Sequence, residues 1–212
     1  SQIETGLPYM CYKDSANNKT NQSNIGTIRS SNLCTEIMEV STPDETSVCN
    51  LASIALPACI TGRVKNKFNH KKLWDTTYFM TRSLDNVIDV NYYPTEKTKT
   101  SNMNHRPIGI GVQGLADVFA ILGIAFDSGE AKKLNKDIFE TIYHAALTAS
   151  CDMAVRKGAY SSFIGSPASK GILQFDMWGK TEEVNERGIY DWEELKGRIV
   201  LQGLRNSLLV AP

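Results

Sequence analysis

The sequence lacks long apolar runs and has no excess charge of either sign. Its uninterrupted apolar stretches are only a few residues long, as at 54–56, whereas a helix that spans a bilayer needs about 20. The first residues also lack the charged-then-apolar pattern of a secretory signal. We therefore expect a soluble protein of the cytoplasm with no membrane partner.

Charges of the two signs balance, since Lys and Arg together number 23 and Asp and Glu together number 23. No net field would attract nucleic acid, so we expect no nucleic-acid partner, and local groups would have to hold a phosphorylated substrate. The chain has 212 residues, of which 42% are hydrophobic and 22% charged. This is an ordinary globular composition, sufficient for one core.

Cysteines are few, and none of them has the C-x-x-C spacing. The odd count of five argues against both a structural zinc site and a secreted disulfide framework. By default, each is a small buried apolar residue. The five are Cys11, Cys34, Cys49, Cys59 and Cys151. The three histidines are scattered along the chain, so we expect no metal site.

Hydrophobic periodicity predicts a mixed α/β chain. Apolar residues recur at helical spacing within 71–88, 113–122, 130–157 and 191–203. Extended structure is predicted at 25–37 and 47–56, with a buried strand within 205–212. Surface loops are predicted at 15–24, at 95–106 and from 158 to 190. A chain seldom stops at a buried strand, so we expect a functional loop to follow it.

The segment SNLCTEI at residues 31–37 carries the most chemistry. Alternate side chains of an extended chain share one face, which would place Asn32, Cys34 and Glu36 on the same face, each about 7 Å along the strand from the next. An amide, a thiol and a carboxylate together suit chemistry on a polyhydroxylated substrate. The pattern fits equally well an edge strand with a polar face and an incidental cysteine.

Several segments in order resemble the large, catalytic subunit of class I ribonucleotide reductases of the eukaryotic and viral type. SNLCTEI is similar to the family's finger-loop signature, and VCNLAS at 48–53 to a strand that bears a redox cysteine. RPIGIGVQGLAD at 106–117 is similar to another family block, and 192–212 fits the family's signature spacing. The resemblance implies an α/β fold in which residues 1–212 form an incomplete part of a ten-stranded catalytic barrel, with Cys34 on an inner finger loop.

The glycines of this third segment also match the G-x-G-x-x-G fingerprint of dinucleotide-binding proteins. The surrounding sequence does not fit that interpretation, because polar residues at 95–106 cannot form the buried strand that precedes such a loop. No strand with a terminal acid follows at the required distance. We therefore interpret these glycines as backbone-packing and helix-entry positions.

The resemblance implies reduction of ribonucleoside diphosphates to deoxyribonucleotides by a thiyl radical. Cys34 would carry the radical, Glu36 would act as general base and Asn32 would bind the same substrate hydroxyls. Cys49 would be one of two thiols that supply electrons and become a disulfide, with its partner outside this segment. Cys11, Cys59 and Cys151 match no functional position.

Partners and cofactors also follow only from the resemblance. They are the reductase small subunit, whose metal-tyrosyl site would supply the radical, a second large subunit, and thioredoxin or glutaredoxin as reductant. ATP and deoxynucleotide effectors would bind regions absent here. We expect this segment to bind no cofactor and to be inactive alone.

Two other interpretations stay open. A catalytically inactive, reductase-derived interaction module would fit the resemblance, although the presence of Asn32, Cys34, Glu36 and Cys49 argues against it. A cysteine hydrolase would need a histidine base, and no histidine has a recognisable relation to Cys34.

Overall fold

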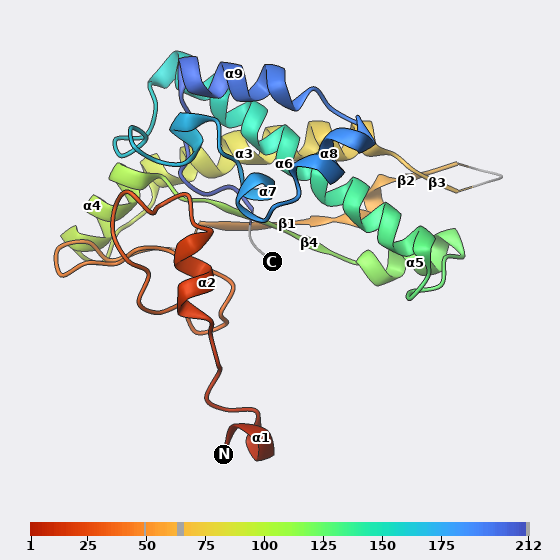
Figure 1. Cartoon of the computed structure of the whole chain (residues 1–212), viewed down its shortest axis with the longest axis horizontal. Coiled ribbons are helices and arrows are strands. Elements are labelled where there is room, and N and C mark those ends of the chain that lie inside the picture. The colour runs from red at the N-terminus through yellow and green to blue at the C-terminus, as the bar shows by residue number, and fades with distance from the viewer. Residues whose placement is uncertain (49, 63–65, 211–212) are drawn as a thin grey trace.

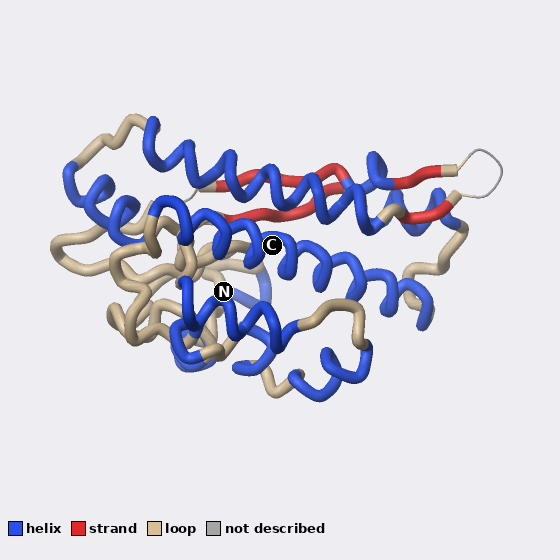
Figure 2. Tube along the Cα trace, turned by 90° about the horizontal axis from the view of Figure 1, so that it is seen from above, coloured by secondary structure: helices blue, strands red, loops and turns tan. Residues whose placement is uncertain are grey.

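A computed structural model describes residues 1–48, 50–62 and 66–210. The long helices α3 (His70–Val90), α6 (Gly129–Lys157) and α9 (Trp192–Gln202) lie on one side of a small parallel sheet (Figure 1). Seen from above, these helices run lengthwise along the body and the strands lie beside them (Figure 2). A slender N-terminal arm with α1 (Gln2–Thr5) projects away from this body.

Each long helix begins at a side chain that accepts a hydrogen bond from a free backbone N–H of the first turn. Asn69 accepts from Lys72, Ser128 from Ala131 and Asp191 from Glu194. The helices predicted at 71–88, 130–157 and 191–203 are therefore confirmed to within a few residues. Helix α5 (Leu115–Leu122), between two left-handed glycines, confirms the prediction at 113–122.

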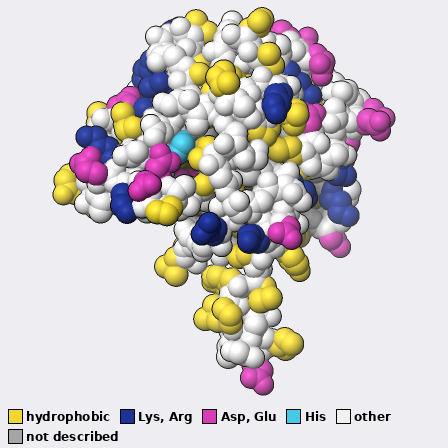
Figure 3. Space-filling model, turned by 60° about the vertical axis from the view of Figure 1, so that its left-hand side comes forward, with side chains coloured by type: hydrophobic (Ala, Val, Ile, Leu, Met, Phe, Trp, Pro, Cys, Tyr) yellow, Lys and Arg dark blue, Asp and Glu magenta, His cyan; other side chains and the backbone are white. Residues whose placement is uncertain are grey.

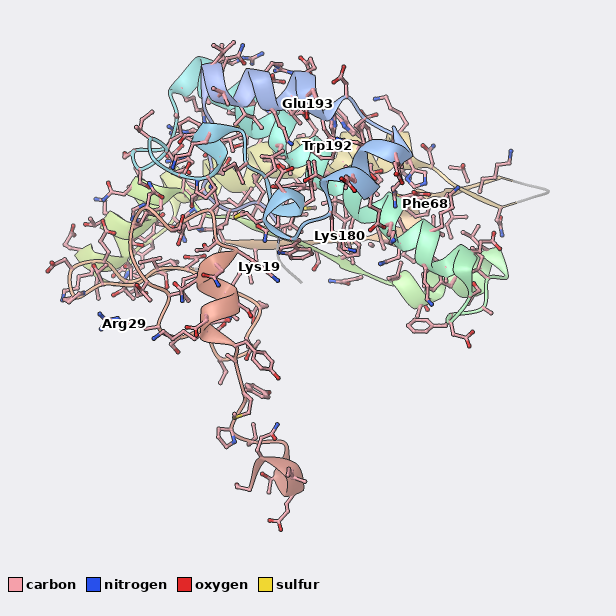
Figure 4. All side chains as sticks on the ribbon, viewed as in Figure 1. Lys19, Arg29, Phe68, Lys180, Trp192 and Glu193 are labelled. Carbon is pink, nitrogen blue, oxygen red and sulfur yellow. The ribbon has the colours of Figure 1, made fainter. Side chains whose placement is uncertain are left out.

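The core lies between these helices and the sheet. The buried faces of α3 and α6 supply Leu73, Ile88, Ile138 and Ile142, each with none of its surface exposed. Trp192 at the start of α9 is 3% exposed and points into this layer, whereas the neighbouring Glu193 points outward (Figure 4). Each such apolar side chain contributes roughly 1.5–3 kcal/mol when fully buried.

The sheet consists of β1 (Leu51–Ala55) and β4 (Gly109–Gln113), which pair in parallel with Leu51 opposite Gly109. β1 confirms the extended segment predicted at 47–56. Val210 forms a single parallel bridge with Ile110, so the strand predicted within 205–212 is present as one bridge among the described residues. The described residues form an α/β arrangement and do not close a barrel. A separate hairpin pairs β2 (Ile60–Thr61) with β3 (Lys67–Phe68), just after the short 3-10 helix η1 (Leu56–Cys59).

The loop predicted at 95–106 is wrong, since this polar segment forms α4 (Glu96–His105). A capping box between Thr95 and Thr98 starts the helix. Its buried face is polar, and Asn102 is completely buried, bonded to Asn50 and to the hydroxyl of Tyr93. Hydrophobic periodicity could not reveal a helix whose buried side chains are satisfied by distant polar groups.

Two further loop predictions need correction. The segment 15–24 is not only a surface loop, because α2 (Lys13–Asn18) reaches into it and Thr20 and Gln22 are buried. The region from 158 to 190 contains η2 (Ala168–Lys170), α7 (Gln174–Met177) and α8 (Thr181–Arg187). These elements are too short to show a helical period, and α7 depends on Asp176, whose carboxylate accepts from the backbone N–H of Leu173.

Candidate active site

Cys34 lies on a loop, residues 29–39, whose two ends are buried. Ile28 is 2% exposed and Val40 is 3% exposed, whereas Cys34 and its neighbour Leu33 are exposed. Arg29, the first residue of the loop, points away from the body (Figure 4). The loop thus has a fixed base and an accessible tip that bears a free thiol.

The extended conformation predicted for 25–37 is wrong, because the chain turns at Cys34. The N–H of Thr35 donates to the carbonyl of Asn32 at 3.1 Å, and Thr35 has a left-handed φ of 66°. Two side chains close the turn: the Ser31 hydroxyl donates to the Ile37 carbonyl at 2.6 Å, and Asn32 Oδ1 accepts from the Ile37 N–H at 3.1 Å. Ser and Asn side chains that bond to local backbone in this way compete with strand pairing.

The turn nevertheless brings the predicted chemical groups together. Asn32 Nδ2 donates to Glu36 Oε1 at 2.5 Å, and Cys34 stands between these two residues in the sequence of the same turn. Glu36 Oε2 is buried and has no hydrogen-bond partner. Asn32 therefore orients the carboxylate through one oxygen and leaves the other free to accept a hydroxyl proton. The predicted geometry, one face of an extended strand, is therefore wrong, and the roles of Asn32, Cys34 and Glu36 stay predictions.

Cys49 lies outside the described residues, so its relation to Cys34 stays a prediction. The residue that follows it, Asn50, is polar and buried. Asn50 Nδ2 donates to Asn102 Oδ1 at 2.9 Å and to the carbonyl of Pro107 at 2.8 Å, which fixes the start of β1 against the start of β4. Hydrogen bonds of Asn50 thus hold the chain in place immediately after Cys49.

Glu39 is a residue that the sequence gave no reason to select. It is 5% exposed, and burial raises its pKa to about 8, although a hydrogen bond from the backbone N–H of Val48 acts in the opposite direction. Glu39 therefore links the Cys34 loop to the residue before Cys49 through a carboxyl group that is largely protonated at neutral pH.

The glycines of the G-x-G-x-x-G match belong to the sheet and to a helix start, as interpreted from the sequence. Gly109 and Gly111 are strand residues of β4, opposite Leu51 and Ser53. Gly114 caps α5 with a φ of 76°, and a Cβ there would lie 2.7 Å from the Pro57 ring. The fingerprint residues thus form the strand itself, where a dinucleotide site needs a loop after a strand.

A buried ion network anchors β4 to the helices. Arg106, 2% exposed, donates through Nε to Asp85 and through Nη1 to Asp89, each at 2.8 Å. The Asn206 amide donates to Asp85 at 3.3 Å and to the Arg106 carbonyl at 3.1 Å. The network joins α3, the start of β4 and the segment that carries Val210. Its members are far apart in sequence, so no local pattern predicted it.

Metal-ligating side chains do not gather in the described residues, which contain no group of three or more His, Cys, Asp or Glu placed to hold an ion. None of the helices in that part of the chain has the length and apolar character needed to cross a membrane.

Hydrophobic side chains gather on the N-terminal arm, where the space-filling view shows them in contact with solvent (Figure 3). The exposed members are Ile3, Leu7, Tyr9, Met10 and Tyr12.

Comparisons with known proteins identify the family. The family model for the ribonucleotide reductase barrel domain matches residues 1–212. The chain is similar over its whole length to the ribonucleoside-diphosphate reductase large chain of Schizosaccharomyces pombe, at 59% identity over 25% of that protein. It is also similar to the large subunits of Caenorhabditis elegans, at 58% identity over 26%, and Arabidopsis thaliana, at 56% over 28%. The chain spans about a quarter of the length of these relatives. It belongs to the ribonucleotide reductase family, as a segment of the barrel domain of a large subunit.

Proposed function

We propose that the protein containing this segment reduces ribonucleoside diphosphates to deoxyribonucleotides, with Cys34 as the radical-bearing residue. The observation that supports this most directly is the turn at 31–37, which carries an exposed free thiol at Cys34 and, two residues further on, a carboxylate with one oxygen bound to Asn32 and the other unpaired. The relatives named above, which are ribonucleoside-diphosphate reductases, have 56–59% identity to the chain.

The groups in this turn suit each step of the reaction. The Cys34 thiyl radical takes a hydrogen atom from C3′ of the ribose and becomes a thiol. The free oxygen of Glu36 accepts the proton of the 3′-hydroxyl, which helps the 2′-hydroxyl to leave as water. Asn32 Nδ2 holds the carboxylate in place for this transfer. After the substrate is reduced, Cys34 returns a hydrogen atom to C3′ and recovers the radical.

The reduction needs two electrons, and we propose that Cys49 and a second cysteine outside this segment supply them. The two thiols lose two hydrogen atoms and become a disulfide, while the nucleotide loses its 2′-hydroxyl as water. Thioredoxin or glutaredoxin would then reduce the disulfide by thiol exchange. The four cysteines Cys11, Cys34, Cys59 and Cys151 are free thiols, a state that a reducing cytoplasm maintains.

The remaining parts of the proposal come from the family. The described strands would belong to a ten-stranded barrel around Cys34, in a large subunit that pairs with a second copy. A small subunit with a metal-tyrosyl site would generate the radical. ATP and deoxynucleotides would regulate the enzyme at regions outside this segment.

An inactive interaction module is less compatible with the site. Such a protein has no use for the bond between Asn32 and Glu36 or for a buried, unpaired oxygen on the half-buried Glu36. The experiment compares turnover of a ribonucleoside diphosphate deuterated at C3′ with that of the unlabelled substrate, in the full-length large subunit with its small subunit. We expect a deuterium isotope effect in the wild type and loss of turnover in Cys34→Ala.

Cys11→Ala is the matched control, because Cys11 is also exposed and free but lies on the N-terminal arm. It should keep wild-type turnover. If Cys34→Ala kept even about one hundredth of wild-type activity, a loss of less than roughly 3 kcal/mol in transition-state stabilisation, the radical role would be wrong.

A further inference from the structure

The two ends of the Cys34 loop are held by side chains of a single short segment, residues 17–22. At one end, Asn17 Oδ1 accepts from the N–H of Ile28 at 2.8 Å and its Nδ2 donates to the Ile28 carbonyl at 2.9 Å. At the other end, Gln22 Oε1 accepts from the N–H of Val40 at 2.8 Å. Neither Ile28 nor Val40 lies in a strand, so these contacts replace the strand pairing that usually fixes a loop base.

Gln22 also contacts the sheet side of the molecule. Its Nε2 donates to Ser207 Oγ at 3.1 Å, and the Ser207 N–H donates to the carbonyl of His105 at 3.1 Å. The next two residues bond to the start of β4 and to the residue before it, since Ile108 and Ile110 donate to the carbonyls of Leu208 and Leu209. One side chain therefore connects the loop that carries Cys34 to the chain segment that extends the sheet.

Burial makes this connection specific. Gln22 is 2% exposed and Ser207 is 4% exposed. A buried amide that lost one partner would leave a polar group unsatisfied, which is energetically costly, so other positions of the loop are disfavoured. The side chain uses its oxygen for Val40 and its nitrogen for Ser207, and an apolar residue of the same size could make neither contact.

We propose that Gln22 is a positioning residue that fixes the Cys34 loop relative to the sheet and thereby sets the approach of the thiol to the substrate. The inference rests on the proposed function. Gln22 acts through Val40, six residues after Cys34. A misplacement of about 1 Å at a reacting centre lowers rates by roughly 100-fold, so a loop anchored at its ends is sensitive to the loss of one anchor.

The test uses the full-length large subunit with its small subunit and measures kcat, KM and the 3′-deuterium isotope effect. We expect Gln22→Met, which removes both contacts at similar size, to lower kcat by about 10-fold to 100-fold, with KM for the ribonucleoside diphosphate within about twofold. The isotope effect should rise, because a misplaced thiol makes hydrogen transfer more nearly rate-limiting. A role in general stability would not change the isotope effect.

Gln22→Glu is the rescue variant, since its carboxylate accepts from Val40 and from the Ser207 hydroxyl. It should recover most of the lost kcat. Asn24→Ala is the matched control, because Asn24 lies in the same polar region but its amide donates to the carbonyls of Ser162 and Ile164, away from the loop. We expect it to leave kcat and the isotope effect unchanged.

Wild-type kcat in Gln22→Met, or a lower kcat with no rise in the isotope effect, would overturn the inference. If Gln22→Met does not fold, Ser207→Ala decides, because it removes only the contact to the sheet: it should lower kcat severalfold and raise the isotope effect, and no change overturns the inference. Turnover by Cys34→Ala would instead show that the proposed function itself has failed.

Discussion

Asn32 Nδ2 donates a 2.5 Å hydrogen bond to Glu36 Oε1, and Glu36 Oε2 has no partner. The carboxylate is oriented by one oxygen, and its other oxygen is buried without a hydrogen-bond partner. We expect Glu36→Gln, which keeps the shape but removes the base, to lower kcat by about 10²- to 10⁴-fold while the KM for the nucleotide changes little. Steady-state kinetics measure both values. Glu193→Gln, a change on the exposed face of α9, should leave both unchanged, and equal effects of the two substitutions would contradict the role of Glu36.

Cys49→Ser should give a different phenotype from Cys34→Ala. As an electron donor, Cys49 acts after hydrogen abstraction, so the substrate radical should still form. Without the second thiol it cannot be reduced, and we expect release of free base and self-inactivation in place of deoxynucleotide. Chromatography of the products with the physiological reductant provides the measurement. A normal yield of deoxynucleotide would refute the assignment.

Glu39→Gln should stabilise the protein at neutral pH. Burial raises the pKa of Glu39 to about 8, above its ordinary value of 4.5, so the folded state loses stability as pH rises from about 4.5 to 8. Gln stays neutral and can still accept from the Val48 N–H. We expect a gain of about 1–3 kcal/mol at pH 7 and almost none at pH 4, measured by denaturant unfolding at both pH values. If Glu39→Gln lowered stability at pH 7, the result would show that the fold favours the charged form of the Glu39 carboxyl group.

His144 should give the opposite pH dependence. Burial, with a smaller effect of the Arg198 charge, lowers its pKa from 6.5 to about 4. Trp74 Nε1 donates to His144 Nδ1 at 3.1 Å, and because indole only donates, this nitrogen carries no proton. The stability that the fold gains from keeping the His144 ring neutral is therefore present above pH 6.5 and is lost as the pH falls toward 4.

The measurement for His144 is the NMR titration of its ring protons together with unfolding from pH 7 to 4. We expect a midpoint near pH 4. His144→Gln, which can still accept from Trp74, should reduce the loss of stability on acidification. Part of the loss of stability in acid should remain in this variant, because burial also lowers the pKa of His70. A midpoint near 6.5 for His144 would contradict its neutral, buried state.

The sequence by itself determined the long helices and predicted which residues are candidates for the chemistry. Helices α3, α6 and α9 follow from apolar residues at helical spacing, because periodicity is a property of neighbouring residues. The motif at 31–37 likewise named Asn32, Cys34 and Glu36, because their chemistry does not depend on the rest of the chain.

Tertiary structure decided how these groups are arranged. α4 is helical although its buried face is polar, because Asn50 and Tyr93 satisfy Asn102 from other parts of the chain. The segment at 31–37 is a turn rather than a strand, and Gln22 is buried because Val40 and Ser207 occupy both ends of its amide. Gln22 and Ser207 are 185 positions apart in the sequence. A polar side chain looks like a surface residue until its partners are known, and only the folded chain brings those partners within hydrogen-bond distance.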